Sequence, residues 1–391
     1  MAMTRRGFLA AAALGAGAAM SARAEGEKLR VCIIGDTKNG GYGHDLHLSW
    51  ALRGDVEISA LADPDEAGRK KRAAEAGALR TYADYREMLE KEKPDVVTVG
   101  PRHTTNHRAY VLAAAACGAH GFIEKPLAAS LEDADAMVEA VNTRGLKWAI
   151  AFNYRTIPEI QHTLRLVRDG LVGDIMELRG RGKEDHRSGG EDLVVLGTHI
   201  FDLMRHFAGP PRWCQATATV DGRVAGRGDI REATEPIGPI IGDSIQARFG
   251  FDGGATGSFA SLKSTAGNAG RWGLDICGTK GMVSIRNEVN GMPCVRVLRS
   301  PGWMPDPDKG LVWEPLPGAP VTVYTHPTAD RYAPITGSLV EAIRENKTPV
   351  VSLDDGRDAL EMVSAVFAAH ISGSRIDMPL KDRRHPLAQN S

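Results

Sequence analysis

The stretch Glu124-Lys125-Pro126 combines residue types suited to redox chemistry on an alcohol. It follows a short apolar run, Gly121-Phe122-Ile123, that we predict to be a buried strand. Open α/β sheets bind their ligands at the carboxyl ends of such strands. A lysine ammonium placed there can hold a substrate oxygen and stabilise the negative charge that develops on it. We therefore interpret Lys125 as the centre of a hydride-transfer site, with Glu124 either restraining it through an ion pair or simply ending the strand.

The loop after the first predicted strand has features of a dinucleotide-binding turn. The strand ends at Gly35, and Thr37, Gly41 and Gly43 follow in the loop. Such a turn needs glycine for its tight bend and for close backbone approach, and the next helix points its N-terminus at the pyrophosphate. Thr37 stands where the middle glycine of the motif is expected. Taken alone, the loop is therefore also consistent with an ordinary strand-to-helix turn.

Two further strand ends favour a nicotinamide cofactor. Asp63 ends the second predicted strand, where a carboxylate accepts hydrogen bonds from the adenosine ribose. It would repel a 2′-phosphate, so it favours NAD over NADP, although an aspartate there can also cap the helix that follows. Pro101 follows the third strand at the same edge of the sheet. We therefore predict NAD as the cofactor.

Predicted strands and helices alternate up to about residue 152. The predicted strands span residues 29–34, 56–62, 94–99, 121–123 and 147–152, and the predicted helices span 44–52, 66–76, 85–91, 106–117 and 131–141. This alternation predicts a doubly wound parallel sheet, so we assign residues 25–150 to an NAD-binding Rossmann domain in an α/β protein.

Strand patterns dominate the rest of the chain. The predicted strands span residues 175–180, 214–220, 244–251, 255–262, 272–277, 282–286 and 294–298, and the predicted helices span 158–169, 191–207, 336–345 and 355–371. Glycine-rich turns such as Asp252-Gly253-Gly254 indicate a large, open, mostly antiparallel sheet. We assign residues 151–391 to an α/β domain for substrate binding and oligomerisation, with residues 221–239 as a surface excursion.

These motifs together resemble the glucose–fructose oxidoreductase / inositol dehydrogenase / MocA family. The matching residues are Gly35, Gly41-Tyr42-Gly43-His44, Asp63, Pro101 with His107, Glu124-Lys125-Pro126-Leu127, Gly197-Thr198-His199-Ile200-Phe201-Asp202 and Asp377-Met378-Pro379-Leu380. The resemblance implies that the nicotinamide lies between the two domains, with Pro101, His107, Glu124 and Lys125 near the cofactor. It also implies a homo-oligomer, a dimer or tetramer, and reversible hydride transfer at a carbinol carbon of a sugar or polyol. Lys125 and His199 are then the catalytic and substrate-binding candidates.

Val195 departs from the pattern of that family. Its sugar and inositol dehydrogenases usually carry an aspartate one helical turn before the histidine that corresponds to His199. A valine side chain cannot orient an imidazole or stabilise its charged form. Asp192 and Asp202 are the candidate replacements, since each lies within two helical turns of the histidine, and Asp192 is also a substrate-binding candidate. We interpret His206 as structural.

Other polar residues near the predicted cleft supply further candidates. Tyr154 and Arg155 follow the last Rossmann strand, so Tyr154 is a reserve acid–base group and Arg155 a substrate-binding candidate. The run Lys183-Glu184-Asp185-His186-Arg187 is either a solvated loop or a substrate wall in which Lys183 or Arg187 binds hydroxyls or a carboxylate. No spacing compels a metal site, and Asp185, His186 and His199 are the weak alternative.

Residues 1–24 are predicted to be a twin-arginine signal peptide. Arg5-Arg6 precedes an apolar run that ends near Met20, and Ala22-Arg23-Ala24 offers a cleavage site. The run is shorter than the ~18–20 residues that a membrane span requires, so we expect periplasmic export without a retained anchor. The net charge of −1 gives no sign of a nucleic-acid partner. The five cysteines form no disulfide or metal pattern, which fits folding before export.

Three functions are consistent with the sequence. The first is an exported NAD-dependent carbohydrate oxidoreductase that holds its cofactor tightly, because the periplasm offers no evident route to recycle NAD. The second is a redox-neutral NAD-dependent glycosidase, in which oxidation at C3 acidifies the C2 proton and His199 or Tyr154 promotes elimination before re-reduction. The third, motivated by Val195, is a cofactor-bound carbohydrate-binding protein without turnover.

Overall fold

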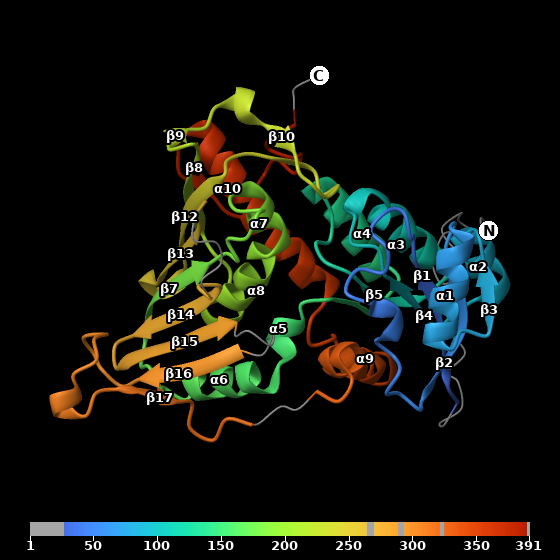
Figure 1. Cartoon of the computed structure of the whole chain (residues 1–391), viewed down its shortest axis with the longest axis horizontal. Helices are drawn as coiled ribbons and strands as arrows, with labels where there is room; N and C mark the ends of the chain where they lie inside the picture. Colours follow the sequence, from blue (N-terminus) through green and yellow to red (C-terminus); the bar gives the residue numbers. More distant parts are fainter. Residues whose placement is uncertain (1–26, 264–269, 288–292, 321–323, 389–391) are drawn as a thin grey trace, which may run out of the picture.

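Two sheets organise the chain (Figure 1). The computed structural model describes residues 27–263, 270–287, 293–320 and 324–388, so the predicted signal peptide lies outside the described residues. Within the described ranges, no helix is both long and apolar enough to cross a membrane.

The N-terminal sheet has six parallel strands in the order β3-β2-β1-β4-β5-β6. They are β1 (Leu29–Ile34), β2 (Val56–Ala62), β3 (Arg80–Tyr82), β4 (Val96–Val99), β5 (His120–Ile123) and β6 (Trp148–Ile150). The strands β4, β5 and β6 are buried along their whole length, as expected for a parallel sheet covered on both faces. The predicted doubly wound parallel sheet is therefore confirmed.

Four helices of this domain begin close to their predicted positions. They are α1 (Glu66–Ala76), α2 (Tyr85–Glu92), α3 (His107–Ala116) and α4 (Leu131–Asn142). Side chains of Asp65, Asp84 and Ser130 accept hydrogen bonds from backbone N–H groups in the first turns of α1, α2 and α4. Such caps are readable in the sequence because they satisfy helix donors that have no partner within the helix.

The predicted helix at residues 44–52 was wrong. The structure has only a one-turn 3-10 helix there, η1 (Leu46–Leu48). The backbone takes positive φ angles at Gly40, Gly41, Gly43 and Asp45, of 91°, 61°, 59° and 59°. An α-helix cannot pass through a residue in the left-handed region, and Asp45 is such a residue inside the predicted range, so no helix can begin at residue 44.

Helix α9 (Pro327–Glu345) covers the sheet face that η1 leaves bare. Tyr332, Ile335 and Leu339 of α9 pack in one cluster with Leu46 and Trp50 against the Rossmann strands. The helix begins nine residues before its predicted start at residue 336. Pro334, which we expected to precede the helix, lies inside it. A segment assigned to the second domain thus completes the core of the first.

The C-terminal sheet has ten strands, with the order β17-β16-β15-β14-β7-β13-β12-β8-β18 and with β9 paired to β8. They are β7 (Ile175–Arg181), β8 (Trp213–Val220), β9 (Arg223–Val224), β12 (Ser244–Gly250), β13 (Thr256–Ser261), β14 (Gly273–Gly278), β15 (Gly281–Asn287), β16 (Pro293–Leu298), β17 (Trp313–Pro315) and β18 (Ile376–Asp377). Neighbours are antiparallel except for β7 and β13, which confirms the predicted mostly antiparallel open sheet.

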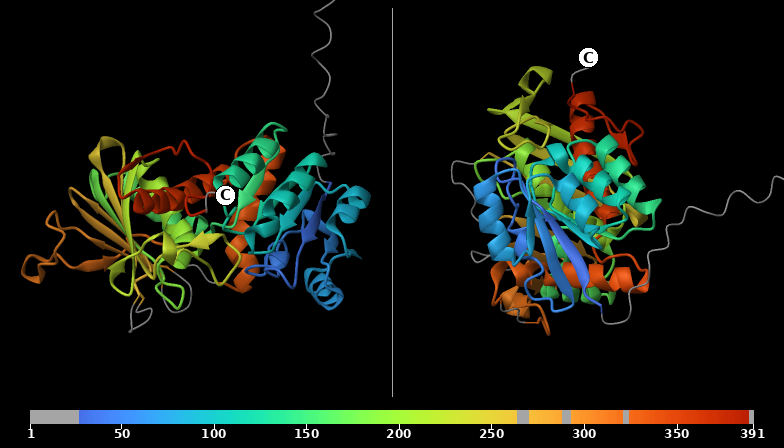
Figure 2. Two further views of the ribbon diagram at one scale, coloured as in Figure 1. Left: turned by 90° about the horizontal axis from the view of Figure 1, so that it is seen from above. Right: turned by 90° about the vertical axis from the view of Figure 1, so that its right-hand side faces the viewer.

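Helices on one side of this sheet connect it to the Rossmann domain. They are α5 (Asn153–Thr156), α6 (Pro158–Arg168), α7 (Gly190–Val195), α8 (Gly197–Ala208) and α10 (Leu353–Ser372). Helix α10 contacts β8 and α8 at one end and α4 and β6 at the other. In Figure 2 this red helix runs from the large sheet toward the teal Rossmann helices.

The predicted helix at residues 191–207 is broken in two. Helix α7 ends at Val195 and α8 begins at Gly197, with Leu196 at φ −110° and ψ −32° between them. An added Cβ at Gly197 would lie 3.1 Å from the ring of Phe259, so the second helix packs closely on β13. The break changes which backbone carbonyls can accept hydrogen bonds from groups outside the helix.

Residues 221–239 are more than a surface excursion. They include η3 (Arg227–Asp229) and β10 (Arg231–Glu232), and β10 pairs with β11 (Pro239–Ile240). The segment then reaches the Rossmann domain, where the backbone N–H and the hydroxyl of Thr104 both donate to the Pro236 carbonyl at 3.1 Å. The remaining short 3-10 helices are η2 (Thr104–Asn106), η4 (Asp252–Gly254) and η5 (Pro307–Lys309).

Candidate active site

Lys125 follows β5 and points its ammonium group at the second domain. The side chain is 4% exposed, and Nζ donates a hydrogen bond to the Val195 carbonyl at 3.1 Å. Burial lowers the pKa of Lys125, while the nearby carboxylate of Glu124 opposes that shift. The ammonium has three donors, and this contact uses one of them.

The helix break explains why the Val195 carbonyl is available. In an unbroken helix this carbonyl would accept from the backbone N–H of His199, four residues later. Here His199 N donates to the Leu196 carbonyl at 3.2 Å. Val195 therefore contributes to the site through its backbone, which the type of its side chain did not reveal.

Glu124 is fully buried and holds two loops together. Its carboxylate accepts from the backbone N–H of His44 at 2.9 Å, from the His44 imidazole Nδ1, and from the backbone N–H of Lys125 at 2.6 Å. Burial alone would raise the pKa of Glu124, but the charge and hydrogen bonds of His44 hold it at about 2. Glu124 thus forms its ion pair with His44 and contacts Lys125 through the backbone.

His199 lies on α8 with its imidazole almost fully buried. Its Nδ1 has no hydrogen-bond partner among the described residues. Burial lowers the pKa of His199 well below 6.5, and the positive charges of Lys125 and His44 lower it further. The imidazole is therefore neutral at neutral pH, a form that can accept a proton.

Neither aspartate proposed as a replacement for the missing partner orients His199. Asp192 is fully buried and accepts from Lys183 N at 3.2 Å, from Glu184 N at 3.0 Å and from Ser261 Oγ at 2.6 Å. Burial raises the pKa of Asp192, and these hydrogen bonds oppose the rise. Asp192 therefore fixes the loop after β7, and its contact with substrate stays a prediction.

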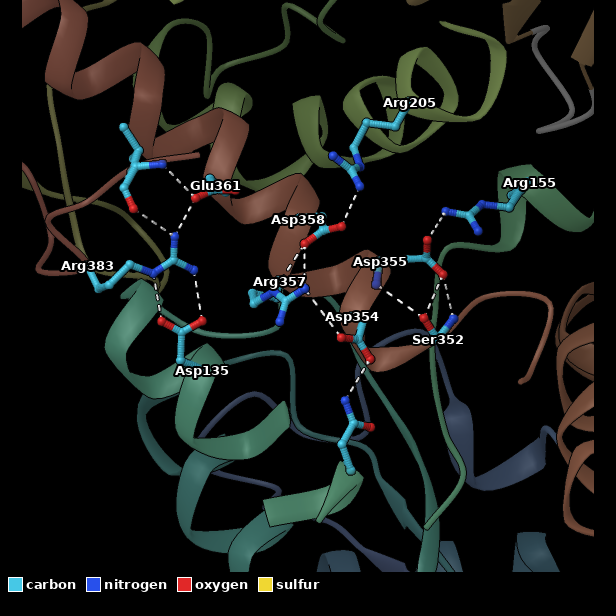
Figure 3. A network of polar contacts seen from close by, with 12 residues as sticks. Asp135, Arg155, Arg205, Ser352, Asp354, Asp355, Arg357, Asp358, Glu361 and Arg383 are labelled. Carbon is cyan, nitrogen blue, oxygen red and sulfur yellow. Dashed lines mark hydrogen bonds and ion pairs between the residues drawn. The ribbon is translucent and has the colours of Figure 1, made fainter. Parts of the chain in front are cut away.

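Arg155 and Asp202 pair with each other. Arg155 Nε donates to Asp202 at 3.0 Å, and the same guanidinium lies 2.9 Å from Asp355 and donates to the Val350 carbonyl at 3.1 Å. Figure 3 shows Arg155 directed at Asp355 near the start of α10, and a separate set of ion pairs further along this helix includes the pair of Asp358 with Arg205. These four contacts give Arg155 a scaffolding role, and the substrate-binding role expected for it stays a prediction.

Four ring-bearing side chains form a cluster beside His199, which we call the aromatic cluster: Phe152, Tyr154, His199 and Trp272. Ring centroids lie 5.0 Å apart for Tyr154 and Trp272, 5.6 Å for Tyr154 and His199, and 5.5 Å for Phe152 and His199. The Tyr154 hydroxyl and Trp272 Nε1 are buried without a partner in the described part of the chain. The prediction missed Trp272, whose only signal is a tryptophan at the start of a predicted strand.

The polar run before α7 is partly engaged near the site. Arg187 donates to Asp185 at 2.7 and 3.1 Å and lies 3.7 Å from Glu235, which also pairs with Arg102 at 3.1 Å. Lys183 Nζ lies 3.6 Å from Asp185. These pairs join the loop to the Rossmann domain. Across the described ranges, no three histidine, cysteine or acidic side chains are grouped as metal ligands would be.

Asp63 is fully buried and its oxygens are occupied by the chain itself. They accept from Thr37 N at 3.1 Å, from Thr37 Oγ1 at 2.6 Å, from the Tyr42 hydroxyl at 2.8 Å and from Asp65 N at 2.9 Å. Tyr42 also covers Gly35, where an added Cβ would lie 2.1 Å from its ring. In this arrangement a ribose has no access to Asp63.

The phosphate turn, residues 35–44, is closed on itself. Asp36 and Gly41 exchange two backbone hydrogen bonds of 3.1 and 2.7 Å, and Gly43 N donates to the Gly40 carbonyl at 3.2 Å. Gly43 must be glycine, because an added Cβ would lie 2.3 Å from the Glu124 side chain. Gly41 differs, since nothing lies within 4 Å of an added Cβ there, so the turn is open to a ligand on that side.

His107 lies between the loops that follow β4 and β5. Its imidazole is fully buried between the Pro101 carbonyl at 2.7 Å and the Leu127 carbonyl at 2.9 Å. It thereby links the loops that follow β4 and β5. Burial lowers the pKa of His107, and the two carbonyls oppose that shift, because only the protonated imidazole can donate to both of them.

The residues present fit a nicotinamide dinucleotide in kind. A glycine turn, an aspartate and a lysine follow β1, β2 and β5, and the aromatic cluster contains donors without a partner among the described residues. Gly41 and Lys125 would contact such a group directly. Asp63 would do so only after Tyr42 and Thr37 release it.

Comparison with known proteins supports the same assignment. Residues 29–152 match the model of an oxidoreductase family with an NAD-binding Rossmann fold, and residues 177–378 match the model of that family's C-terminal alpha/beta domain. A solved levoglucosan dehydrogenase in complex with NADH and levoglucosan shares the fold, with a TM-score of 0.71 and 21% identity over 90% of this chain and 100% of that one.

The curated relatives of the chain include two sugar dehydrogenases that match part of it. A levoglucosan dehydrogenase of Pseudarthrobacter phenanthrenivorans is 26% identical over 257 residues, 59% of this chain and 65% of that protein. A D-apiose dehydrogenase of Paraburkholderia graminis is 33% identical over 192 residues, 46% of this chain and 51% of that protein. Each alignment thus spans less than two-thirds of the relative's own length. With both domain models matched, the chain belongs to the glucose–fructose oxidoreductase / inositol dehydrogenase / MocA family of oxidoreductases with an NAD-binding Rossmann fold.

Proposed function

We propose that the protein is an exported NAD(H)-dependent oxidoreductase that transfers a hydride to or from a carbinol carbon of a sugar, polyol or glycoside. One observation carries this proposal. A buried lysine ammonium, which makes one hydrogen bond within the described part of the chain, lies at the end of β5, against the turn that leads into α8 and a neutral histidine. Oxidising an alcohol requires a cation that holds its oxygen and a base that accepts its proton, and these two groups supply both.

The roles of the chain's own residues follow from their environments. When bound, NAD(H) supplies the acceptor or donor of the hydride. Lys125 holds the substrate oxygen with the donors that the Val195 carbonyl leaves free. His199 accepts the proton as a neutral imidazole. Because its pKa is lowered by burial, it returns the proton readily and is ready for the reverse reaction.

The names of relatives support a carbohydrate substrate. The two curated relatives are dehydrogenases of levoglucosan and of D-apiose. The predicted signal peptide supports export, and export favours a tightly held cofactor because the periplasm provides no evident way to recycle it. The carboxylate of Asp63 favours NAD over NADP once Tyr42 has moved.

A redox-neutral NAD-dependent glycosidase is the second candidate. The observation that favours it is the presence of two acid–base groups, with the Tyr154 and His199 rings 5.6 Å apart. A simple alcohol oxidation uses one such group, whereas elimination needs a second to remove the C2 proton. This protein would hydrolyse a glycoside without net formation of NADH.

Three measurements on the purified mature protein test these proposals. Denaturation should release NAD(H), which chromatography identifies. Incubation with added NAD and a panel of sugars should form NADH in a Lys125-dependent manner. Hydrolysis of glycosides without NADH would instead establish the second candidate, and the absence of any Lys125-dependent turnover would leave a binding protein.

We further propose that the protein forms a dimer or tetramer through the open face of its large sheet. A hollow of about 880 Å³ runs over that face, lined by Gln215, Thr217, Gln246, Arg248 and Ser258 among others. Light scattering of the mature protein tests this, and a monomer at micromolar concentration would contradict it.

A further inference from the structure

Residues 230–241 reach from the second domain to the first, and we call this segment the strap. Its two short strands, β10 and β11, pair through Arg231 with Ile240 and Glu232 with Pro239, so residues 233–238 between them form its tip. Figure 1 shows the yellow-green chain after β10 running toward α4 of the Rossmann domain. The tip of the strap is therefore the part that contacts the other domain.

The tip is fastened to the loop that follows β4. The backbone N–H and the hydroxyl of Thr104 donate to the Pro236 carbonyl at 3.1 Å, and Arg102 Nε lies 3.1 Å from the Glu235 carboxylate. The same loop leans on the phosphate turn, where Arg102 N donates to the Gly40 carbonyl at 3.3 Å. The strap is thus attached next to the turn that is predicted to hold the pyrophosphate.

The tip also packs on the loop that follows β5. Gly238 has a φ of 94°, and an added Cβ there would lie 3.2 Å from the Cβ of Ala129. Ile237 is buried in the same apolar cluster as Leu127, which follows the Lys125-Pro126 step. The strap therefore contacts the loops after two neighbouring strands of the parallel sheet.

On its other side the strap contacts the elements that lead to the site lysine. The backbone N–H of Thr234 donates to Glu191 at 3.1 Å, and its hydroxyl donates to the same carboxylate. Glu191 is buried in the first turn of α7, the helix that ends at Val195 and presents its carbonyl to the lysine. Glu235 lies 3.7 Å from Arg187, in the loop before α7. The tip is thus held by both domains.

The position of these contacts suggests a role in cofactor binding. In the strand order β3-β2-β1-β4-β5-β6 the chain reverses direction between β1 and β4, and open sheets of this kind bind ligands in the crevice at the carboxyl ends of those strands. The strap is fastened at that edge. The side chain of Arg102 is 47% exposed, and ion pairs of this kind are individually weak, so the tip can detach without unfolding the protein.

We propose that the strap closes the cofactor cleft, so that a nicotinamide dinucleotide enters and leaves only when Glu235 releases Arg102 and Arg187 and the tip detaches from Thr104. This inference rests on the proposed function and extends it, because it supplies a means by which an exported oxidoreductase keeps its cofactor. Glu235 acts here as a positioning residue that holds the strap, and it takes no part in hydride transfer.

The rates of cofactor entry and release test the proposal. Stopped-flow fluorescence follows NADH binding to the mature protein after removal of bound nucleotide, and release of NADH into excess NAD. Glu235→Gln should raise both rate constants by ~3- to 10-fold, because the strap loses two ion pairs. Thr104→Val removes one hydrogen bond from the tip and should raise both by ~2- to 5-fold. A closure affects entry and release alike, whereas a residue that merely contacts the cofactor affects release.

Glu232→Gln is the matched control, since Glu232 lies on β10 of the same strap and is exposed. Both of its rate constants should stay within about twofold of the original. Rate constants in Glu235→Gln equal to those of this control, or faster release without faster entry, overturn the closure. Formation of NADH from sugars is recorded in parallel. Lys125-dependent turnover with unchanged entry and release upholds the oxidoreductase and overturns the strap, whereas a protein that binds no NADH in any variant overturns both.

Discussion

The phosphate turn and the aromatic cluster both bury several polar atoms, but they treat those atoms in opposite ways. At the turn, Asp63 accepts four hydrogen bonds from Thr37, Tyr42 and Asp65. In the cluster, the hydroxyl of Tyr154 and nitrogens of two neighbouring rings have no partner in the described part of the chain. The hydrogen bonds of Asp63 at the turn are complete without a ligand, whereas those of the aromatic cluster are incomplete among the described residues.

This difference separates stability from function. A buried carboxylate with several donors stabilises the fold, and removing it would leave those donors unpaired. Buried donors without partners lower stability, so we expect a protein to keep them where a bound ligand supplies the missing hydrogen bonds. The comparison predicts that changes at the turn act mainly on unfolding, while changes near the cluster act mainly on activity. Four experiments test this division.

The largest effect is expected at Lys125. Lys125→Met should lower kcat by about 10²–10³-fold, because it removes the cation that holds the substrate oxygen. The free energy of unfolding should change by less than ~1 kcal/mol, since the ammonium makes one hydrogen bond to a carbonyl and is otherwise costly to bury. Lys147→Met, in the loop before β6, serves as the control with unchanged kcat. A large loss of stability in Lys125→Met would show that the lysine is structural.

The next effect is expected at the turn. Asp63→Ala should lower the free energy of unfolding by ~2–4 kcal/mol, because the donors of Thr37 and Tyr42 would lose their acceptor. Urea denaturation measures this. Asp84→Ala, which removes a simple helix cap from α2, should cost only ~1 kcal/mol. Equal costs for the two variants would contradict the view that Asp63 organises the turn.

A smaller effect is expected from pH. The pKa of His199 is well below 6.5 in the folded state, so the stability due to the neutral imidazole is present above the unfolded pKa and is lost as pH falls below it. His199→Gln should therefore be relatively more stable, by ~1–2 kcal/mol, at pH ~5 than at pH ~7. Denaturation at both pH values measures the difference. His186→Gln, at an exposed position, should show no such change, and an equal change in both variants would refute the assignment.

The smallest effect is expected at Val195. Val195→Ala keeps the carbonyl that accepts from Lys125, so kcat/KM should stay within about threefold of its original value. The loss of two methyl groups should lower the free energy of unfolding by ~1–2 kcal/mol. A loss of activity above tenfold would show that the side chain, and not the backbone, supports the lysine.

Local patterns predicted much of the fold. Continuous apolar runs marked the strands of the parallel sheet, and Asp65, Asp84 and Ser130 marked helix starts, because both signals act over a few residues. The helix expected at residues 44–52 failed for a related reason. Its apolar spacing was present, but Asp45 takes a left-handed conformation inside the predicted range, and α9, which is distant in the chain, packs against the sheet there.

For the site, too, local patterns predicted some features and left others undetermined. The sequence by itself determined which residue types lie at the ends of β1, β2 and β5, because strand order and strand ends follow from local pattern and right-handed connection. Only the tertiary structure decided their partners: Glu124 with His44, Arg155 with Asp202, and Lys125 with a carbonyl freed by a helix break. Burial and hydrogen-bond completion depend on segments that are distant in the chain, so local spacing does not encode whether a polar group is satisfied or left for a ligand.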